Sequence, residues 1–298
     1  MNRKTTYLLF GVLVLLVSLW WGQRRWQARK TAEYFAKKPL VENFQPEAVD
    51  RIEILRNHDR GELQAFRRDG AWMLGDNPSL PADPVAVDRL FVALRRAEIK
   101  RVAALRRENL DQFGLEEINR TTVRLRQGEA TRYEFGLGVS SEDFLSTYVT
   151  RLDDPKVYFI EGFTREDIAP DWRDLAVLHF EPTDATQIAY AQKRGFTLTK
   201  GNNQEWTLDG QPTKTDAVKE LVRELSNLRA EDVTATHATF TPSGLTIEIN
   251  TPSGTQALII GQSHSDGGVF VKNTAGYFYT LTKKTKEEIL PTRRALLR

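Results

Sequence analysis

Two parts of the chain resemble each other in sequence, and this internal similarity constrains the fold more than any other feature of the sequence. Residues 48–178 and 185–298 present the same ordered series of segments, which pairs Trp72 with Trp206 and Tyr158 with Tyr279. The series also pairs a Gly-Leu turn at residues 113–115 with residues 243–245. An ordered series of matches is hard to obtain by chance, so the sequence predicts two copies of one folding unit.

Each copy combines strand patterns with a single long helical pattern. Apolar residues three and four positions apart predict helices around residues 85–94 and 218–228. Alternation in segments such as residues 120–126 predicts antiparallel strands with one buried face. We therefore expect an α+β fold of two tandem similar lobes, each a mainly antiparallel sheet covered by one long helix. Trp72 and Trp206 should both lie in the core.

An uncharged and mostly apolar run occupies residues 5–23. As a helix it would be about 28 Å long, close to the ~30 Å thickness of a bilayer's hydrocarbon core. Tyr7 lies near one end and Trp20 and Trp21 at the other, where aromatic rings favour the membrane interface. Bulky residues stand where signal peptidase needs small ones. The sequence therefore predicts an uncleaved N-terminal transmembrane helix.

Basic residues lie on both sides of this run, so they do not settle its orientation alone. A literal count of positive charges would place the main body in the cytoplasm. A run so close to the start of the chain is, however, the usual layout of a bacterial export anchor. We expect a single-pass protein of the bacterial inner (cytoplasmic) membrane with an extracytoplasmic, periplasmic body. The expected parts are an anchor with basic flanks at residues 1–30, a stalk at 31–47, and lobes at 48–180 and 181–298.

Four short motifs follow the apolar run in a fixed order: Gly70-Ala71-Trp72, Ala82-Asp83-Pro84, Phe113-Gly114-Leu115-Glu116 and Gly136-Leu137-Gly138. In this order they resemble the DUF4340 family over most of residues 45–298, including the duplication. The resemblance departs after the Gly-Leu turn, where such families usually carry a proline and this chain has Glu117-Ile118-Asn119. It implies an envelope protein found beside ABC-type transport components, including gliding-motility-like auxiliary subunits. It implies no catalytic residue.

Composition and spacing indicate neither an enzyme nor a metal protein. The chain has no cysteine, which excludes disulfides, thiol nucleophiles and cysteine-based metal sites. None of the four histidines, His58, His179, His237 and His264, has a metal-ligand spacing. We expect no catalytic residue, no metal and no cofactor.

The first 30 residues hold six of the 42 basic residues and none of the 40 acidic ones. The mildly acidic remainder argues against nucleic-acid binding.

One cluster of basic residues is the candidate partner patch: Arg95, Arg96, Lys100, Arg101, Arg106 and Arg107. It has two interpretations. The residues can be a solvated helix face and edge-strand charges that discourage sheet-to-sheet pairing. Alternatively, they can dock an acidic partner or anionic headgroups.

The sequence therefore favours a membrane-anchored extracytoplasmic binding or scaffold protein, an accessory subunit of an envelope assembly such as an ABC-type transport or gliding-like system. The expected partner is a membrane protein. Two alternatives stay open: a periplasmic enzyme of the carbohydrate hydrolase class, and a ligand sensor with a pocket between the lobes. A cleft with convergent ionisable groups would favour the enzyme, and a flat or apolar surface would favour the binding protein.

Overall fold

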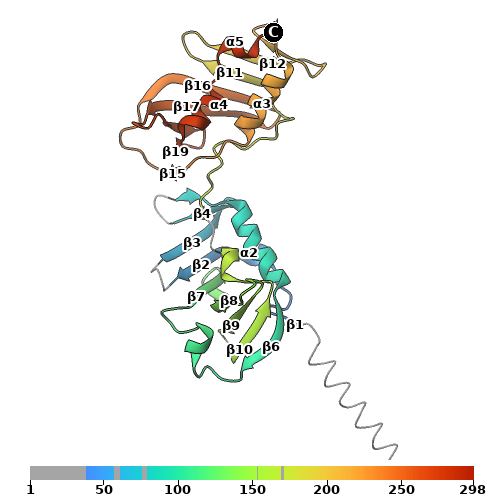
Figure 1. Cartoon of the computed structure of the whole chain (residues 1–298), viewed down its shortest axis with the longest axis vertical. Coiled ribbons are helices and arrows are strands. Elements are labelled where there is room, and N and C mark those ends of the chain that lie inside the picture. Colours follow the sequence, from blue (N-terminus) through green and yellow to red (C-terminus); the bar gives the residue numbers. More distant parts are fainter. Residues whose placement is uncertain (1–37, 57–60, 76–78, 153, 169–170) are drawn as a thin grey trace, which may run out of the picture. The chain divides into compact units, whose positions relative to one another are not determined.

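The computed structural model describes residues 38–56, 61–75, 79–152, 154–168 and 171–298 (Figure 1). The expected transmembrane segment at residues 5–23 and the first part of the expected stalk lie outside these ranges. Within them, no helix is both long enough and apolar enough to cross a membrane.

Two mainly antiparallel sheets and a few helices make up the described chain, as expected (Figure 1). The ten strands of the first sheet are β1 (Lys38–Pro39), β2 (Arg51–Arg56), β3 (Gly61–Arg68), β4 (Ala71–Leu74), β5 (Leu80–Pro81), β6 (Glu98–Ala104), β7 (Thr121–Gln127), β8 (Ala130–Ser140), β9 (Ser146–Arg151) and β10 (Asp154–Glu161). Its helical elements are η1 (Pro46–Ala48), α2 (Pro84–Arg96), η2 (Leu110–Phe113) and η3 (Arg165–Ile168).

The nine strands of the second sheet are β11 (Gln187–Ala191), β12 (Phe196–Lys200), β13 (Trp206–Leu208), β14 (Gln211–Pro212), β15 (Asp232–Thr234), β16 (Pro242–Thr251), β17 (Gly254–Ser263), β18 (Val269–Asn273) and β19 (Phe278–Leu281). Its helices are α3 (Thr215–Ser226), α4 (Lys283–Ile289) and α5 (Arg293–Leu296).

The second sheet repeats the strand order of the first. From β6 onward the first sheet runs β6-β10-β9-β8-β7-β2-β3-β4-β5, and the second runs β15-β19-β18-β17-β16-β11-β12-β13-β14. Numbered along its own lobe, each strand of the second sheet therefore occupies the same place as the corresponding strand of the first. The two sheets also share a register shift at equivalent places, between Leu137 and Ser140 on β8 and between Ile260 and Ser263 on β17. A shared bulge supports the equivalence independently of the strand order.

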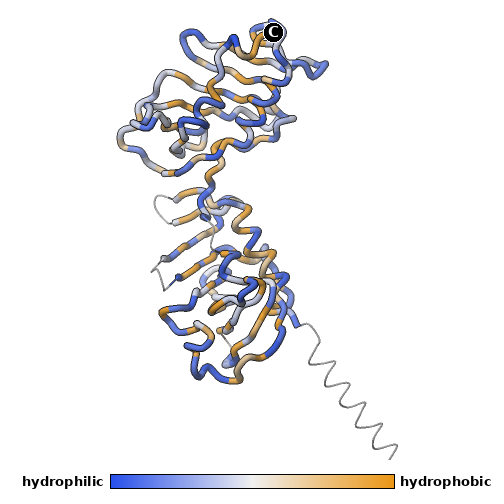
Figure 2. Tube along the Cα trace, in the orientation of Figure 1, coloured by the Kyte–Doolittle hydropathy of each residue, from blue (hydrophilic) through white to orange (hydrophobic). Residues whose placement is uncertain are grey.

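Alternating apolar residues bury one face of each sheet under its long helix. Hydrophobic and hydrophilic positions alternate along the strands in Figure 2. On α3, Val218, Leu221, Val222 and Leu225 join the buried cluster formed by β11 to β19. On α2, Leu90 and Leu94 are fully buried. The predicted 3.6-residue periodicity therefore marks the faces that lie in the core.

Contacts divide the chain into two compact units. Unit 1 contains the described residues of Met1–Glu62 and Asp88–Pro170, and unit 2 those of Leu63–Val87 and Asp171–Arg298. The division differs from the expected boundary at 180/181 because residues beyond β5 bind the segment that leads into the second sheet. The Asp83 amide donates to the Trp172 carbonyl at 2.7 Å, and the Asp174 amide donates to the Pro81 carbonyl at 2.9 Å.

The described part of the expected stalk also belongs to a sheet. β1 pairs with β6, aligning Lys38 with Ile99. Leu40, which follows β1, is 1% exposed, and its amide donates to the Ala97 carbonyl at 2.8 Å. An edge strand offers unpaired backbone groups, and the preceding chain satisfies them here.

Two expected equivalences hold only in part. Trp72 and Trp206 occupy the same register position, opposite Arg67 and Lys200, but Trp206 is buried whereas Trp72 is half-buried. Residues 243–245 lie inside β16, whereas Phe113 is the last residue of η2 and Gly114 and Leu115 follow it. A Gly-Leu dipeptide alone is a poor predictor of a turn. The segments beside it decide whether it forms a turn or continues a strand.

Candidate functional site

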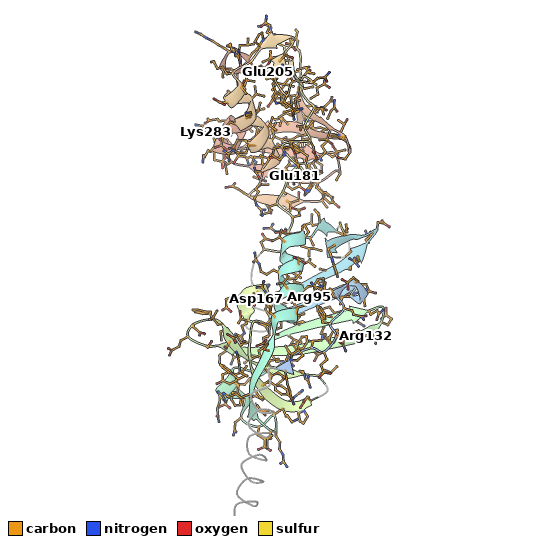
Figure 3. The ribbon with its side chains drawn as sticks, turned by 90° about the vertical axis from the view of Figure 1, so that its right-hand side faces the viewer. Arg95, Arg132, Asp167, Glu181, Glu205 and Lys283 are labelled. Carbon is orange, nitrogen blue, oxygen red and sulfur yellow. The ribbon has the colours of Figure 1, made fainter. Side chains whose placement is uncertain are left out.

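The structure separates the six basic residues of the predicted patch along β6. Arg95, labelled in Figure 3, and Arg96 end α2, next to the first residues of β6. Lys100 and Arg101 lie within β6, and Arg106 and Arg107 follow its end. A strand of seven residues is about 20 Å long, so the two arginine pairs lie at opposite ends of it.

Most of these cations have local partners. Arg95 lies 3.8 Å from Glu47, and Lys100 forms an ion pair with Glu161. The Arg101 guanidinium stacks over the Phe159 ring, with 4.9 Å between its central carbon and the ring centroid. At the other end, Arg106 lies 3.6 Å from Glu108, and Arg107 donates to the carbonyls of Arg151 and, at 2.8 Å, Asp154. Five of the six residues therefore have a carboxylate, a carbonyl or an aromatic ring as a neighbour.

Exposed large apolar side chains are concentrated in unit 1. Among the described residues they are Val102, Leu105, Ile118, Val139, Phe144, Leu145 and Leu152 in unit 1, and Val85 in unit 2. Four of them, Ile118, Val139, Phe144 and Leu145, belong to the end of the sheet where β8 turns into β9. We call these four residues the turn surface, and we treat it as the candidate functional site.

A network of short hydrogen bonds fixes the turn between β8 and β9. The Asp143 carboxylate accepts the Ser141 hydroxyl at 2.5 Å and the Leu145 amide at 3.0 Å. The Phe144 amide donates to the Ser141 carbonyl at 3.0 Å. The hydrogen bond from Ser141, helped by the one from the Leu145 amide, lowers the pKa of Asp143 below its ordinary value.

This turn holds Phe144 in a conformation that aromatic residues avoid. Its φ angle is 58°, in the left-handed region, and the residue is 61% exposed. Backbone preference favours glycine or asparagine at such a position. Exposure removes most of the burial that would stabilise a phenylalanine there. Such strain is concentrated at functional positions in proteins.

Arg165 holds the loop of Ile118 against the end of β8. Its Nη2 donates to the carbonyls of Asn119 at 2.5 Å and Leu137 at 3.0 Å, and lies 3.4 Å from that of Gly114. Burial lowers the pKa of this guanidinium. One side chain thus joins three carbonyls from two segments, the loop that contains Ile118 and the end of β8 that contains Val139.

Two of the sequence motifs meet beneath the same surface. A Cβ atom on Gly138 would lie 2.1 Å from the Phe113 carbonyl oxygen. One on Gly136 would lie 2.6 Å from the Thr150 hydroxyl. Gly114 itself has a φ of 61°. Gly114 and Gly138 therefore allow the close approach of the η2 loop to β8, and Gly136 leaves room for Thr150 on β9.

A pocket of about 490 Å³ lies at the other end of unit 1. Its lining residues include Leu40, Tyr133, Phe135, Arg151 and Leu152. Two of its ionisable side chains form ion pairs: Arg151 binds Asp154 at 3.0 Å, and Glu134 binds Arg124 at 2.6 Å, whereas Glu42 on the same lining is exposed. These paired charges hold the pocket wall in place instead of offering a free acid or base.

The described residues contain no group of three or more histidine, aspartate or glutamate side chains placed to hold a metal ion.

Sequence reasoning missed Phe144 and Arg165. The available signal was the run Ser141-Glu142-Asp143-Phe144-Leu145, where two large apolar residues end a polar turn. Arg165 gave no local signal, because its acceptors lie 28 to 51 residues away.

Comparisons with known proteins give one family. A model of the family described as "Domain of unknown function (DUF4340)" matches residues 72–247, which covers parts of both sheets. Neither the curated proteins nor the solved structures contain a match.

Proposed function

The chain belongs to the DUF4340 family, and we propose that it is a membrane-anchored extracytoplasmic binding or scaffold protein. In this role it is an accessory subunit of an envelope assembly, such as an ABC-type transport or gliding-like system. The observation that carries the proposal is Phe144, an exposed aromatic side chain held at a strained backbone position. A partner that covers the ring would recover the burial free energy that the isolated chain lacks.

The rest of the turn surface fits a protein partner. Ile118, Val139 and Leu145 provide further exposed apolar area at the same end of unit 1. Arg165 and the Asp143 network hold the two contributing segments in place before binding. A preorganised apolar surface loses little conformational entropy on association.

The paired charges around the unit 1 pocket favour binding over catalysis. An acid or base must reach a substrate proton, and Arg151 and Glu134 are occupied by Asp154 and Arg124. We therefore place the periplasmic hydrolase second.

We further propose that the two sheets arose by duplication of one lobe. The shared strand order and the shared bulge on β8 and β17 support this origin. The two copies then diverged at their surfaces, because the equivalents of Val139 and Leu152 in the second sheet are the polar residues Gln262 and Thr274.

Site-directed photo-cross-linking tests the partner. A photoreactive amino acid at position 144, in the full chain within native membranes, should give a discrete cross-linked band. Val85 is the matched control, because it has the same 61% exposure but lies at the start of α2. Phe144→Ser should reduce co-purification of the cross-linked protein, and Val85→Ser should not. Equal cross-linking from both positions would contradict a specific surface.

Protease protection tests the topology. Protease added to spheroplasts should digest the body and leave a small membrane fragment that contains residues 5–23. Complete protection until lysis would place the body in the cytoplasm.

A further inference from the structure

β1 is the first described strand of unit 1, and its pairing shows in which direction the described chain runs along β6. β1 runs antiparallel to β6, so the first residue of β1 points toward the end at which β6 finishes. The turn from β9 to β10 lies at this same end, because Arg151 pairs with Asp154 there and Val157 pairs with Ala104.

Two leucines are exposed at this end. Leu105 is 72% exposed directly after β6, and Leu152 is 56% exposed directly after β9. Arg107 brings their two segments together, because it donates to the carbonyls of Arg151 and Asp154. We call Leu105, Arg106, Arg132 and Leu152 the entry surface.

The unit 1 pocket joins the entry surface, since Leu152 and Arg132 line it together with Tyr133 and Val41. Arg106 and Arg132 are both exposed. Glu108, 3.6 Å from Arg106, and Glu42 on the pocket lining are the acidic groups beside them. The surface therefore combines two exposed leucine side chains with arginines whose longer side chains can extend beyond the leucines.

The second sheet has a different surface at the corresponding place. The position of Leu152 is taken by Thr274, and that of Tyr133 by Gln256. The Gln256 side chain accepts the His179 amide at 2.8 Å and donates to the His179 carbonyl, which closes this part of the second sheet. The same fold is thus built without the exposed apolar residue, so folding alone does not require Leu152.

We propose that the entry surface lies against an anionic lipid bilayer, with Leu105 and Leu152 in the interface and Arg106 and Arg132 beside lipid phosphates. This inference rests on the proposed membrane anchor at residues 5–23. Only residues 24–37 connect that segment to β1, and even a fully extended chain of this length spans no more than about 50 Å. The first residue of β1 points along β6 toward the entry surface, and exposed leucines with neighbouring arginines suit the interface of a bilayer.

The absence of cysteine from the chain makes a direct test possible. Full-length Leu105→Cys and Leu152→Cys variants, each carrying a polarity-sensitive fluorophore, are reconstituted into vesicles of phosphatidylcholine with phosphatidylglycerol. Ile118→Cys and Phe144→Cys are the matched controls, because these exposed apolar positions lie at the opposite end of β9. Brominated acyl chains serve as the quencher.

At positions 105 and 152, the proposal expects emission that is shifted to the blue relative to the probe in water. It also expects lower intensity in vesicles with brominated lipid than in vesicles without it. Neither change should occur at positions 118 and 144. Arg106→Gln together with Arg132→Gln should reduce the shift, most clearly when the anionic lipid is present. Solvent-like emission at 105 and 152, or a shift that appears only in native membranes with other proteins, would overturn it. Flotation separates the two proposals: a chain that does not float with vesicles refutes the anchor, whereas a floating chain with solvent-like probes refutes the entry surface alone.

Discussion

Leu40 and Val177 hold equivalent positions at the edges of the two sheets. The Leu40 amide donates to Ala97 at 2.8 Å, and the Val177 amide donates to Leu228 at 3.0 Å. Their carbonyls accept from the paired positions Arg151, at 3.3 Å, and Asn273, at 3.4 Å. Each lobe therefore begins before its first long strand, with a segment that forms backbone hydrogen bonds to the edge of the lobe's sheet.

Leu40→Ala should lower the free energy of unfolding of unit 1 by about 2–5 kcal/mol, because it leaves a cavity at a fully buried site. Urea unfolding of the full chain in detergent, followed by circular dichroism, measures the change. Glu42→Ala is the control, since it is exposed and should change stability by no more than about 0.5 kcal/mol. Equal effects would mean that residues 38–41 do not belong to the folded unit.

The two equivalent tryptophans should differ in their contribution to stability. Trp206→Ala should cost about 3–5 kcal/mol, because the ring is buried among the core residues of the second sheet. Trp72→Ala should cost clearly less, because its ring is half-buried. Thermal unfolding of both variants in the same detergent compares them, and a larger loss for Trp72 would be inconsistent with their burial.

Phe144→Gly should raise the free energy of unfolding by up to about 1 kcal/mol, since it removes a left-handed strain of about 1–2 kcal/mol at the entropic cost of a glycine. The same change should weaken partner co-purification. Unfolding assays and pull-downs on one preparation test both effects. A destabilised variant would show that the ring packs within the chain, which would remove the reason to treat it as a docking residue.

Asp154 should make unit 1 less stable in acid. Burial raises the pKa of its carboxyl, but hydrogen bonds from the Tyr158 hydroxyl, the Lys156 amide and Arg151 together hold it below the ordinary value. A lowered folded-state pKa gives stability that is present above the unfolded value of about 3.9 and is lost as the pH falls through the folded one.

The comparison for this carboxyl is Asp154→Asn. The variant should be less stable than the wild type at neutral pH, and the difference should shrink as the pH drops below about 3.9. Urea unfolding across this range measures it. A difference independent of pH would assign the effect to packing rather than to ionisation.

The sequence alone determined the local elements and their repetition. Periods of two and 3.6 residues identified the strands around residues 120–126 and the helices that became α2 and α3. These patterns can be predicted because each element must bury one face, whatever it packs against. The resemblance to the DUF4340 family also rested on the order of short motifs, which needs no coordinates.

The tertiary structure decided which distant residues share a surface. The six basic residues are close in sequence, but β6 separates them along its length, and other segments supply partners such as Glu47 and Glu161. The three carbonyls that Arg165 binds likewise lie on segments that meet only after the sheet forms. Hydrophobic periodicity reports burial along one element, whereas strand pairing, side-chain ion pairs and backbone strain depend on contacts between elements, which no local pattern encodes.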